Sequence, residues 1–391
     1  PDPVVLLYGR YWATYSEGKC HAHNNIPYLC LPAMISRRRF NQWLAAGLVA
    51  GTLPGLSRRA NAMPDAQQKL RVAAIQMAPQ LGDVAANLEQ AERLIRQAQK
   101  QGAEWIALPE MFTTAAAFHP DMLFSIRPLD GAPAQLLKRL ARQGNCVIGG
   151  SFLAERAGNV YNSFLLVFPD GNVEQHDKDF PTYWENCVCL GGDDAGVLAT
   201  PIGNVGSVLC WEFLRSDTAR RLAGKVKLVV GGSCWWTLPD DADTDNPMWE
   251  TNLKMLQKAP VRFARMLGVP VIHGSHAGAF KGFYSPDLPD VAYNSTYLGE
   301  SMIVDALGNI LARRAVADGA GVVTAEISLP KQQLPSESIP DSFWIPEEMP
   351  RVWKESWKRW FDTGSHYYRT VTKPYLDTGV INEYVPKYML E

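Results

Sequence analysis

Residues 205–212 read Val-Gly-Ser-Val-Leu-Cys-Trp-Glu, an apolar run that ends in a cysteine, a tryptophan and a carboxylate. The run Val205–Leu209 is typical of a buried strand. A helix is predicted directly after it, over Phe213–Ala223, and the next apolar run, Leu228–Gly231, is predicted as another strand. A strand, a helix and a further strand in this order indicate an α/β domain.

The same alternation continues on both sides of this stretch. The further predicted strands are Leu70–Met77, Trp105–Leu108, Cys146–Phe152, Asn162–Phe168, Val173–His176, Val197–Thr200, Val269–His273, Ser301–Val304, Ile310–Arg313 and Gly321–Ile327, and the further helices are Val84–Gln101, Ala134–Gln143 and Met248–Leu267. Pro260 is expected to break or kink the last helix, because proline lacks the N–H of a helical hydrogen bond. No internal repeat is visible, so the sequence predicts one α/β domain of mixed strand order.

Composition excludes several classes of protein. The chain has 391 residues, of which 47% are hydrophobic and 20% charged, which is near the average for globular proteins and unlike disordered or collagen-like chains. The formal net charge is -2, but residues 1–62 hold seven basic and two acidic residues, so the rest of the chain is acidic. An acidic body does not favour phosphate backbones, and no nucleic-acid partner is expected.

Residues 34–62 are arranged like an export signal. A basic stretch, Ser36-Arg-Arg-Arg-Phe40, is followed by a mildly apolar run and then by Ala60-Asn-Ala62, the form of a signal-peptidase site. The apolar run is shorter than the roughly 20 residues of a membrane span, so no stable span is expected. The paired arginines resemble a twin-arginine signal, which predicts a periplasmic or otherwise exported product that begins near Met63. The alternative is a basic amphipathic anchor that stays attached, which Gly47 and Pro54 disfavour.

The remaining segments follow from these boundaries. Residues 1–33 show no periodicity and precede Met34, so they are expected to be an upstream segment outside the native protein. Residues 63–329 form the predicted globular domain. Residues 330–391 are a tail rich in Trp, Tyr and Pro, expected to lie either over a partner or over the domain itself.

The sequence offers little support for a metal site or a cofactor. Five cysteines follow the predicted signal, an odd number that leaves at least one thiol free or paired between chains. Cys187 and Cys189 are spaced like a metal pair, but no second pair and no histidine cluster lies nearby in the sequence. No glycine-rich phosphate loop is visible either. We therefore expect no metal and no cofactor.

Three polar residues stand out by their order and their flanks. Glu110 follows the end of an apolar strand, Lys178 follows a hairpin signal at 169–171, and Cys210 ends the strand Val205–Leu209. Each alone is more common as a solvated carboxylate, a surface lysine or a core thiol. Together, strand-Leu-Pro-Glu, then Lys-x-x-Pro-Thr, then Gly-x-x-x-Cys-Trp-Glu resemble the nitrilase superfamily of carbon–nitrogen hydrolases.

The resemblance extends over about 70–327, so that 63–329 is expected to be a carbon–nitrogen hydrolase domain. It implies a four-layer α-β-β-α sandwich with an extended C-terminal tail, and a homodimer or higher homo-oligomer. It also implies a catalytic triad of Glu110, Lys178 and Cys210, with Glu185 as a second glutamate that follows the lysine.

These residue types suit attack on a carbon–nitrogen bond. A cysteine attacks as its thiolate, and Glu110 can take the thiol proton and return it to the leaving amine. Lys178 supplies positive charge where the oxyanion develops, together with the backbone N–H of Trp211. Glu185 is expected to hold Lys178 or the substrate in place.

Three further residues are candidates for substrate binding. Trp235 and Trp236 are predicted either to line an apolar acyl pocket or to fill core. His276 is expected either to face that pocket or to be structural.

The resulting prediction is thiol-dependent hydrolysis of a non-peptide amide, with release of ammonia or an amine. The alternatives are a nitrilase acting on an organic nitrile, which Trp211-Glu212 favours, a non-catalytic binding member, and an acyltransferase that uses the same acyl-thioester.

Overall fold

The computed structural model describes residues 4–8, 11–16, 19–22, 68–239 and 247–379. The chain divides into two units, Pro1–Ala66 and Gln67–Glu391. In the first unit, β1 (Val4–Tyr8), β2 (Tyr11–Ser16) and β3 (Lys19–Ala22) form an antiparallel sheet, which sequence periodicity does not predict. The predicted export signal at 34–62 lies outside the described residues.

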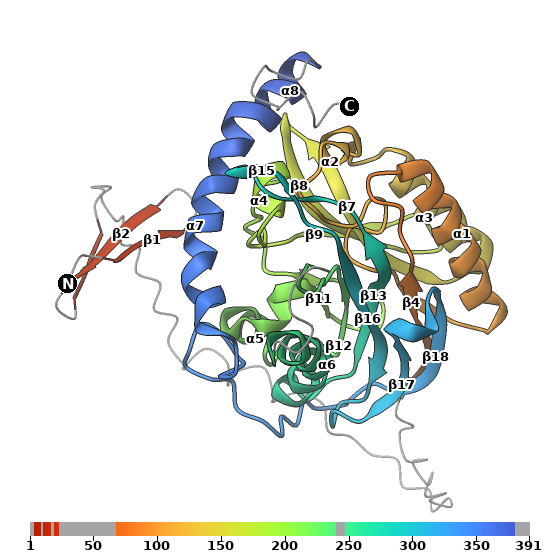
Figure 1. Ribbon diagram of the computed structural model, residues 1–391. Helices are drawn as coiled ribbons and strands as arrows, with labels where there is room; N and C mark the ends of the chain where they lie inside the picture. Colours follow the sequence, from red (N-terminus) through yellow and green to blue (C-terminus); the bar gives the residue numbers. More distant parts are fainter. Residues whose placement is uncertain (1–3, 9–10, 17–18, 23–67, 240–246, 380–391) are drawn as a thin grey trace, which may run out of the picture. The chain divides into compact units, whose positions relative to one another are not determined.

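The second unit alternates strands and helices largely as expected (Figure 1). Its strands are β4 (Lys69–Met77), β5 (Trp105–Ala107), β6 (Arg127–Pro128), β7 (Val147–Arg156), β8 (Asn159–Val167), β9 (Val173–Asp177), β10 (Val197–Leu198), β11 (Val205–Leu209), β12 (Leu228–Ser233), β13 (Val271–Phe280), β14 (Phe283–Ser285), β15 (Leu288–Ala292), β16 (Ser295–Val304), β17 (Ile310–Ala315) and β18 (Gly321–Ser328). Its helices are α1 (Val84–Lys100), α2 (Asp121–Phe124), α3 (Ala132–Gly144), α4 (Glu185–Val188), the 3₁₀ helix η1 (Cys210–Leu214), α5 (Ser216–Leu222), α6 (Pro247–Leu267), the 3₁₀ helix η2 (Val316–Asp318), α7 (Arg351–Tyr367), the π-helical segment η3 (Tyr368–Thr372) and α8 (Lys373–Thr378).

Alternating side chains on the strands produce the predicted layers. On β4, Ile75 and Met77 belong to a core shared with α1 and α3, whereas Val72 faces the opposite way into a second core. On β11, Leu209 contributes to that second core, and Val208 packs with α5 and α6 in a third. Helices therefore cover the outer sides of two facing groups of strands (Figure 1), which confirms the α-β-β-α sandwich.

The strand directions explain why distant residues meet. The neighbouring strands β11, β12, β13, β4, β5 and β7 are parallel, and β9 runs the same way because it pairs through the antiparallel β8. The carboxyl ends of parallel strands lie at one edge of a sheet, where α/β proteins usually bind ligands. Glu110, Lys178 and Cys210 all follow such carboxyl ends.

Two helices differ from the sequence prediction. The helix expected over Phe213–Ala223 is split into η1 and α5, because Arg215 has an extended backbone and its buried guanidinium binds Asp179. The helix α6 continues through Pro260, so the predicted break is wrong, whereas the predicted kink stays a prediction. Its apolar face is buried in the core that it shares with α5, which offsets the single hydrogen bond that proline removes.

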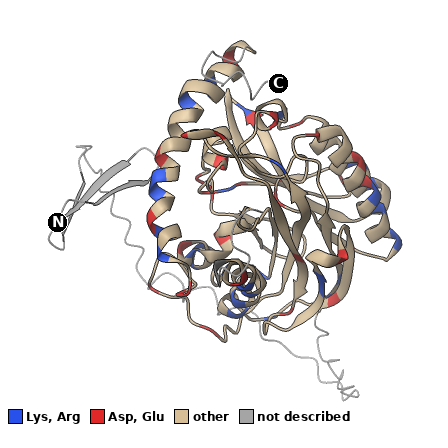
Figure 2. Ribbon diagram, in the orientation of Figure 1, with Lys and Arg blue, Asp and Glu red and all other residues tan. Residues whose placement is uncertain are grey.

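The C-terminal tail packs over its own domain, which is one of the two expected arrangements. The N–H of Val160 in β8 donates to the Tyr368 hydroxyl at 3.1 Å, and the Thr372 hydroxyl donates to the carbonyl of Cys187 in α4 at 2.5 Å. Residues of both charge signs are spread along α1 and α7 (Figure 2), as is usual for surface helices. Within the described ranges, no helix is both long enough and apolar enough to span a bilayer.

Candidate active site

Three of the predicted site residues form a buried ionic cluster. Lys178 Nζ lies 2.8 Å from Glu110 Oε1, and 2.7 Å and 2.9 Å from the two carboxylate oxygens of Glu185. All three side chains are at most 2% exposed. A buried lysine between two carboxylates is held firmly, because removing either kind of charge would leave the other without a partner. The structure thus brings together residues that lie up to 75 positions apart in the chain.

Cys210 joins this cluster from the end of β11. It is 2% exposed, and its Sγ lies 4.0 Å from the backbone oxygen of Cys234. Its φ of 50° is unusual for a residue with a side chain, and Met111, next to Glu110, and Tyr183, two residues before Glu185, also have positive φ. Such backbone strain, of about 1–3 kcal/mol per residue, is often found at functional sites.

The carboxylate of Glu110 is fixed by two donors that sequence analysis did not identify. Asn162 Nδ2 donates to Glu110 Oε1 at 3.0 Å, and the backbone N–H of Cys234 donates to Oε2 at 2.9 Å. The backbone around Cys234 can come this close to Glu110 only with a glycine at 232. A Cβ at that position would lie 2.6 Å from the Gly274 carbonyl oxygen and 3.1 Å from the backbone N of Glu110. Asn162 is a polar residue just before the apolar run of β8, and this position is the sequence feature that could have indicated its contact with Glu110.

Burial sets the protonation of the cluster. Burial and the nearby Glu110 carboxylate raise the pKa of the Cys210 thiol, and the Lys178 ammonium opposes this only in part. Burial would lower the pKa of Lys178, but Glu110 and Glu185 outweigh it and hold that pKa well above its usual value. Burial raises the pKa of Glu185 to about 7 against the opposing effect of Lys178. The resting site therefore holds a protonated thiol beside a charged lysine, and the thiol needs a base before it can attack.

The turn after Cys210 supplies a backbone donor of the expected kind. Trp211 is the second residue of η1, and the first N–H groups of a helix have no intrahelical acceptor. Its N–H is therefore a candidate donor for an oxyanion that forms beside the Cys210 sulfur.

A cavity of about 330 Å³ opens beside Cys210, within the usual size range of small-molecule sites. Trp211, Trp235 and Trp236 line it, as do residues of the tail. Trp235 serves both predicted roles, since it lines the cavity and is only 3% exposed within the core. Asn252 of α6 fixes this wall, because it accepts from Trp235 Nε1 at 2.6 Å and donates to the Trp236 carbonyl at 2.8 Å.

Of the two roles expected for His276, the structure favours the structural one. His276 is fully buried and is absent from the lining of the described cavities. Its Nε2 lies 2.8 Å from the backbone oxygen of Glu110, so this nitrogen carries the proton. Burial lowers the pKa of His276 to about 4, which keeps the ring neutral. His276 therefore supports the backbone that carries Glu110.

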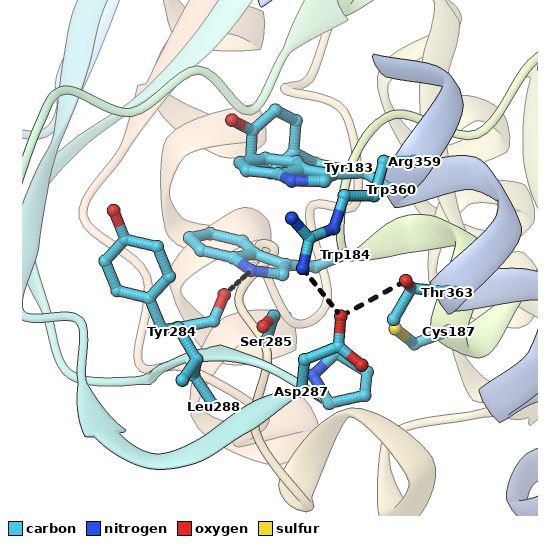
Figure 3. Close-up of a pocket in the computed structure, with 12 residues that line it drawn as sticks. Tyr183, Trp184, Cys187, Tyr284, Ser285, Asp287, Leu288, Arg359, Trp360 and Thr363 are labelled. Atoms are coloured by element: carbon cyan, nitrogen blue, oxygen red, sulfur yellow. Dashed lines mark hydrogen bonds and ion pairs between the residues drawn. The ribbon is translucent and has the colours of Figure 1, made fainter. Parts of the chain in front are cut away.

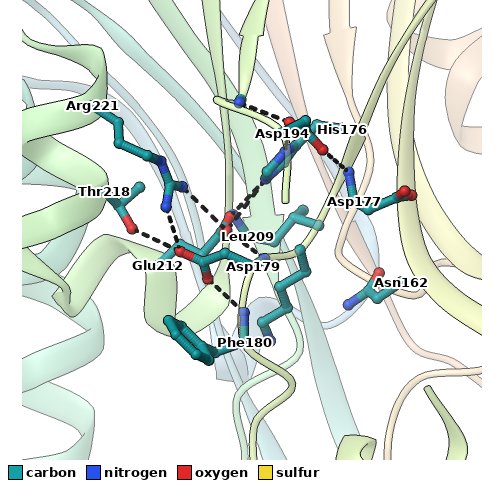
Figure 4. Close-up of polar contacts among 12 residues, drawn as sticks. Asn162, His176, Asp177, Asp179, Phe180, Asp194, Leu209, Glu212, Thr218 and Arg221 are labelled. Atoms are coloured by element: carbon teal, nitrogen blue, oxygen red, sulfur yellow. Dashed lines mark hydrogen bonds and ion pairs between the residues drawn. The ribbon is translucent and has the colours of Figure 1, made fainter. Parts of the chain in front are cut away.

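A second buried network lies behind the site and involves Glu212 (Figure 4). Its carboxylate accepts from the backbone N–H of Leu209 at 2.8 Å and of Asp179 at 3.0 Å, and both its oxygens lie 3.2 Å from His176 Nε2. Burial lowers the pKa of His176, but Glu212 and Asp194 outweigh it and raise that pKa to about 10. Glu212 thus connects the segment that carries Lys178 to the segment that carries Cys210. It does not line the cavity beside Cys210.

The described residues contain no group of three or more His, Cys, Asp or Glu side chains placed to hold a metal ion. The five cysteines after the predicted signal are all free thiols.

Comparison with known proteins places the chain in a family. A model of the carbon-nitrogen hydrolase family matches residues 71–334. The chain is 34% identical to a nitrilase of Pyrococcus abyssi over 41% of its own length and 63% of the relative's, and 29% identical to omega-amidase NIT2 of Mus musculus over 42% and 66%. These matches thus span about two thirds of each relative.

A solved structure shares the fold. The carbon-nitrogen hydrolase from Helicobacter pylori superposes with a TM-score of 0.57 at 20% identity, over 67% of this chain and 90% of that one. The family match covers the three motifs and the sheet edge at which they meet. This chain belongs to the carbon-nitrogen hydrolase family.

Proposed function

We propose that the protein hydrolyses a small non-peptide amide through an acyl-enzyme on Cys210. The observation that carries the proposal is the buried contact of Glu110 with Lys178 beside a cysteine that opens into a cavity. Glu110 removes the thiol proton as the sulfur attacks and transfers it to the leaving amine, and Lys178 balances the oxyanion. Water then releases the acid. That the enzyme forms a homo-oligomer stays a proposal, supported by the family resemblance alone.

Glu185 has a positioning role in this mechanism. Both its oxygens contact Lys178 Nζ, so it fixes the ammonium while the charge of Glu110 changes during proton transfer. Because both oxygens of Glu185 are engaged by Lys178, support of Lys178 is favoured over substrate binding among the two expected roles.

Nitrile hydrolysis is the second candidate, because the chain is similar to a nitrilase of Pyrococcus abyssi. An amide needs Glu110 as an acid when the amine leaves, whereas a nitrile first gives a thioimidate that water must attack. The chain is similar to an omega-amidase as well, so the comparisons favour neither reaction.

Matched pairs of substrates separate the two reactions. We expect a carboxamide to release ammonia faster than the nitrile with the same side chain, because the fixed Glu110 is placed to protonate a leaving amine. Steady-state ammonia release across several pairs measures this, with Cys210→Ala as the blank. Faster release from the nitrile in most pairs would reverse the assignment.

We also propose that residues 34–62 direct export to the periplasm and that the mature domain begins near Met63. The proposal rests on the order of basic stretch, apolar run and Ala-Asn-Ala in the sequence. We expect Arg37→Lys together with Arg38→Lys to retain the precursor in the cytoplasm, since a twin-arginine signal requires the arginine pair. Fractionation with N-terminal sequencing measures it; periplasmic material that begins at Pro1 or Met34 would contradict the proposal.

A further inference from the structure

We propose, building on the function above, that the cavity beside Cys210 selects an uncharged aromatic acyl group and that the tail helix α7 supplies the selecting wall. Neither a substrate class nor a role for the tail follows from the catalytic residues themselves. The substrate class and the role of the tail are inferred from two features of the cavity: aromatic rings line it, and its described lining contains no charged side chain.

Aromatic rings line much of the cavity, and several of them contact one another. Tyr183 lies edge-on to Trp211 at 6.4 Å and to Trp236 at 6.0 Å between ring centroids, and Trp353 stacks with Trp211 at 6.4 Å and an angle of 30°. Tyr284, Tyr293 and Trp360 complete the aromatic lining. Aromatic pairs at such distances and angles are favourable, so a flat ring inserted among them gains both burial and specific geometry.

The described lining of this cavity contains no charged side chain. Lys178, the cation of the buried ionic cluster, is already paired with Glu110 and Glu185. A carboxylate on the acyl group would therefore be buried without a partner and close to two glutamates, which is strongly unfavourable.

The tail forms the outer wall through one face of α7. Trp353, Ser356 and Trp360 all line the cavity, and their spacing of three and four residues places them on the same side of a helix. The charged residue Arg359 instead lines a second cavity of about 150 Å³, where its guanidinium lies 3.7 Å from Asp287 (Figure 3). The tail thus contributes the rings of Trp353 and Trp360 to the cavity beside Cys210, whereas Arg359, paired with Asp287, lines the second cavity.

Three amides of similar size test the selectivity of the wild-type protein. They are phenylacetamide, which is neutral and aromatic, succinamate, which is anionic, and 5-aminopentanamide, which is cationic. We expect kcat/KM for phenylacetamide to exceed that for succinamate by at least about 100-fold, the scale on which a site rejects a ligand whose polar group stays unpaired. Equal or faster turnover of either charged amide would overturn the inference.

Variants of the wall test the role of α7. Trp353→Ala is expected to lower kcat/KM for phenylacetamide by about 10- to 100-fold, the loss that a removed apolar contact produces, and to change that for acetamide by less than about 3-fold. Trp353→Phe should restore most of the loss. Trp249→Ala is the matched control, because Trp249 is 38% exposed and absent from the cavity lining. Equal losses on both amides would show a structural role for Trp353 and overturn the role of the tail.

Binding separates this inference from the proposed function. Isothermal titration of Cys210→Ala with phenylacetamide and succinamate measures the preference of the cavity without turnover. Preferred binding of phenylacetamide with no wild-type hydrolysis of any amide would overturn the proposed function alone. Cysteine-dependent hydrolysis with preferred binding of a charged amide would overturn the inference alone.

Discussion

Replacing Cys210 by alanine is expected to abolish turnover, with a loss of at least about four orders of magnitude, because no acyl-enzyme can form without the sulfur. Folding should be little affected, since alanine removes one atom from a buried site whose Sγ makes only a distant 4.0 Å contact with the backbone oxygen of Cys234. Initial rates and urea unfolding of the variant and the wild type measure the two effects. Undiminished activity of the alanine variant would eliminate the proposed mechanism.

Cys146→Ala is the matched control for this experiment. Cys146 is a free thiol as buried as Cys210, at 2% exposed, but it lies in the core shared with α1 and α3. We expect this variant to keep its activity. Mass spectrometry of wild-type protein quenched during turnover should find the acyl adduct on the peptide that contains Cys210, and an adduct on any other cysteine would contradict the assignment.

The second large effect is expected for Glu110→Gln, which should lower turnover by at least about two orders of magnitude, the usual contribution of a general acid–base. The Glu110 carboxylate raises the pKa of the Cys210 thiol, so its removal by itself favours ionisation of the sulfur. A fall in rate therefore reports lost proton transfer. Rates measured in a single turnover, where product release does not contribute, give the clearest value.

The same substitution should also lower stability. The carboxylate accepts from Lys178 and Asn162 at one oxygen and from the N–H of Cys234 at the other. A glutamine has one acceptor oxygen, so its NH₂ group would face a donor, at a cost of about 1–3 kcal/mol in the free energy of unfolding. Glu110→Asp keeps the charge and serves as the comparison. A Gln variant with wild-type rate would show that Glu110 transfers no proton.

The local structure was predictable where the chain's own periodicity reflects burial. The predicted strand Leu70–Met77 and the predicted helix Val84–Gln101 match the observed bounds of β4 and α1 to within one residue, and the strand before Cys210 is confirmed as β11. These elements are specified by side chains that are neighbours in the sequence. The helix after Cys210 was predicted as one segment because its interruption at Arg215 depends on Asp179, which is 36 residues distant.

The residue types and their order are evident without a structure, and the motifs around Glu110, Lys178 and Cys210 indicate the family. Which side chains touch depends on how the strands and the tail pack. Closure of the parallel strands brings Lys178 to both glutamates, places His276 beneath Glu110, and folds the tail so that Trp353 reaches the cavity. Such contacts join residues from 7 to 166 positions apart, and periodicity within a short window carries no information about them, because burial reveals that a face is covered but not by what.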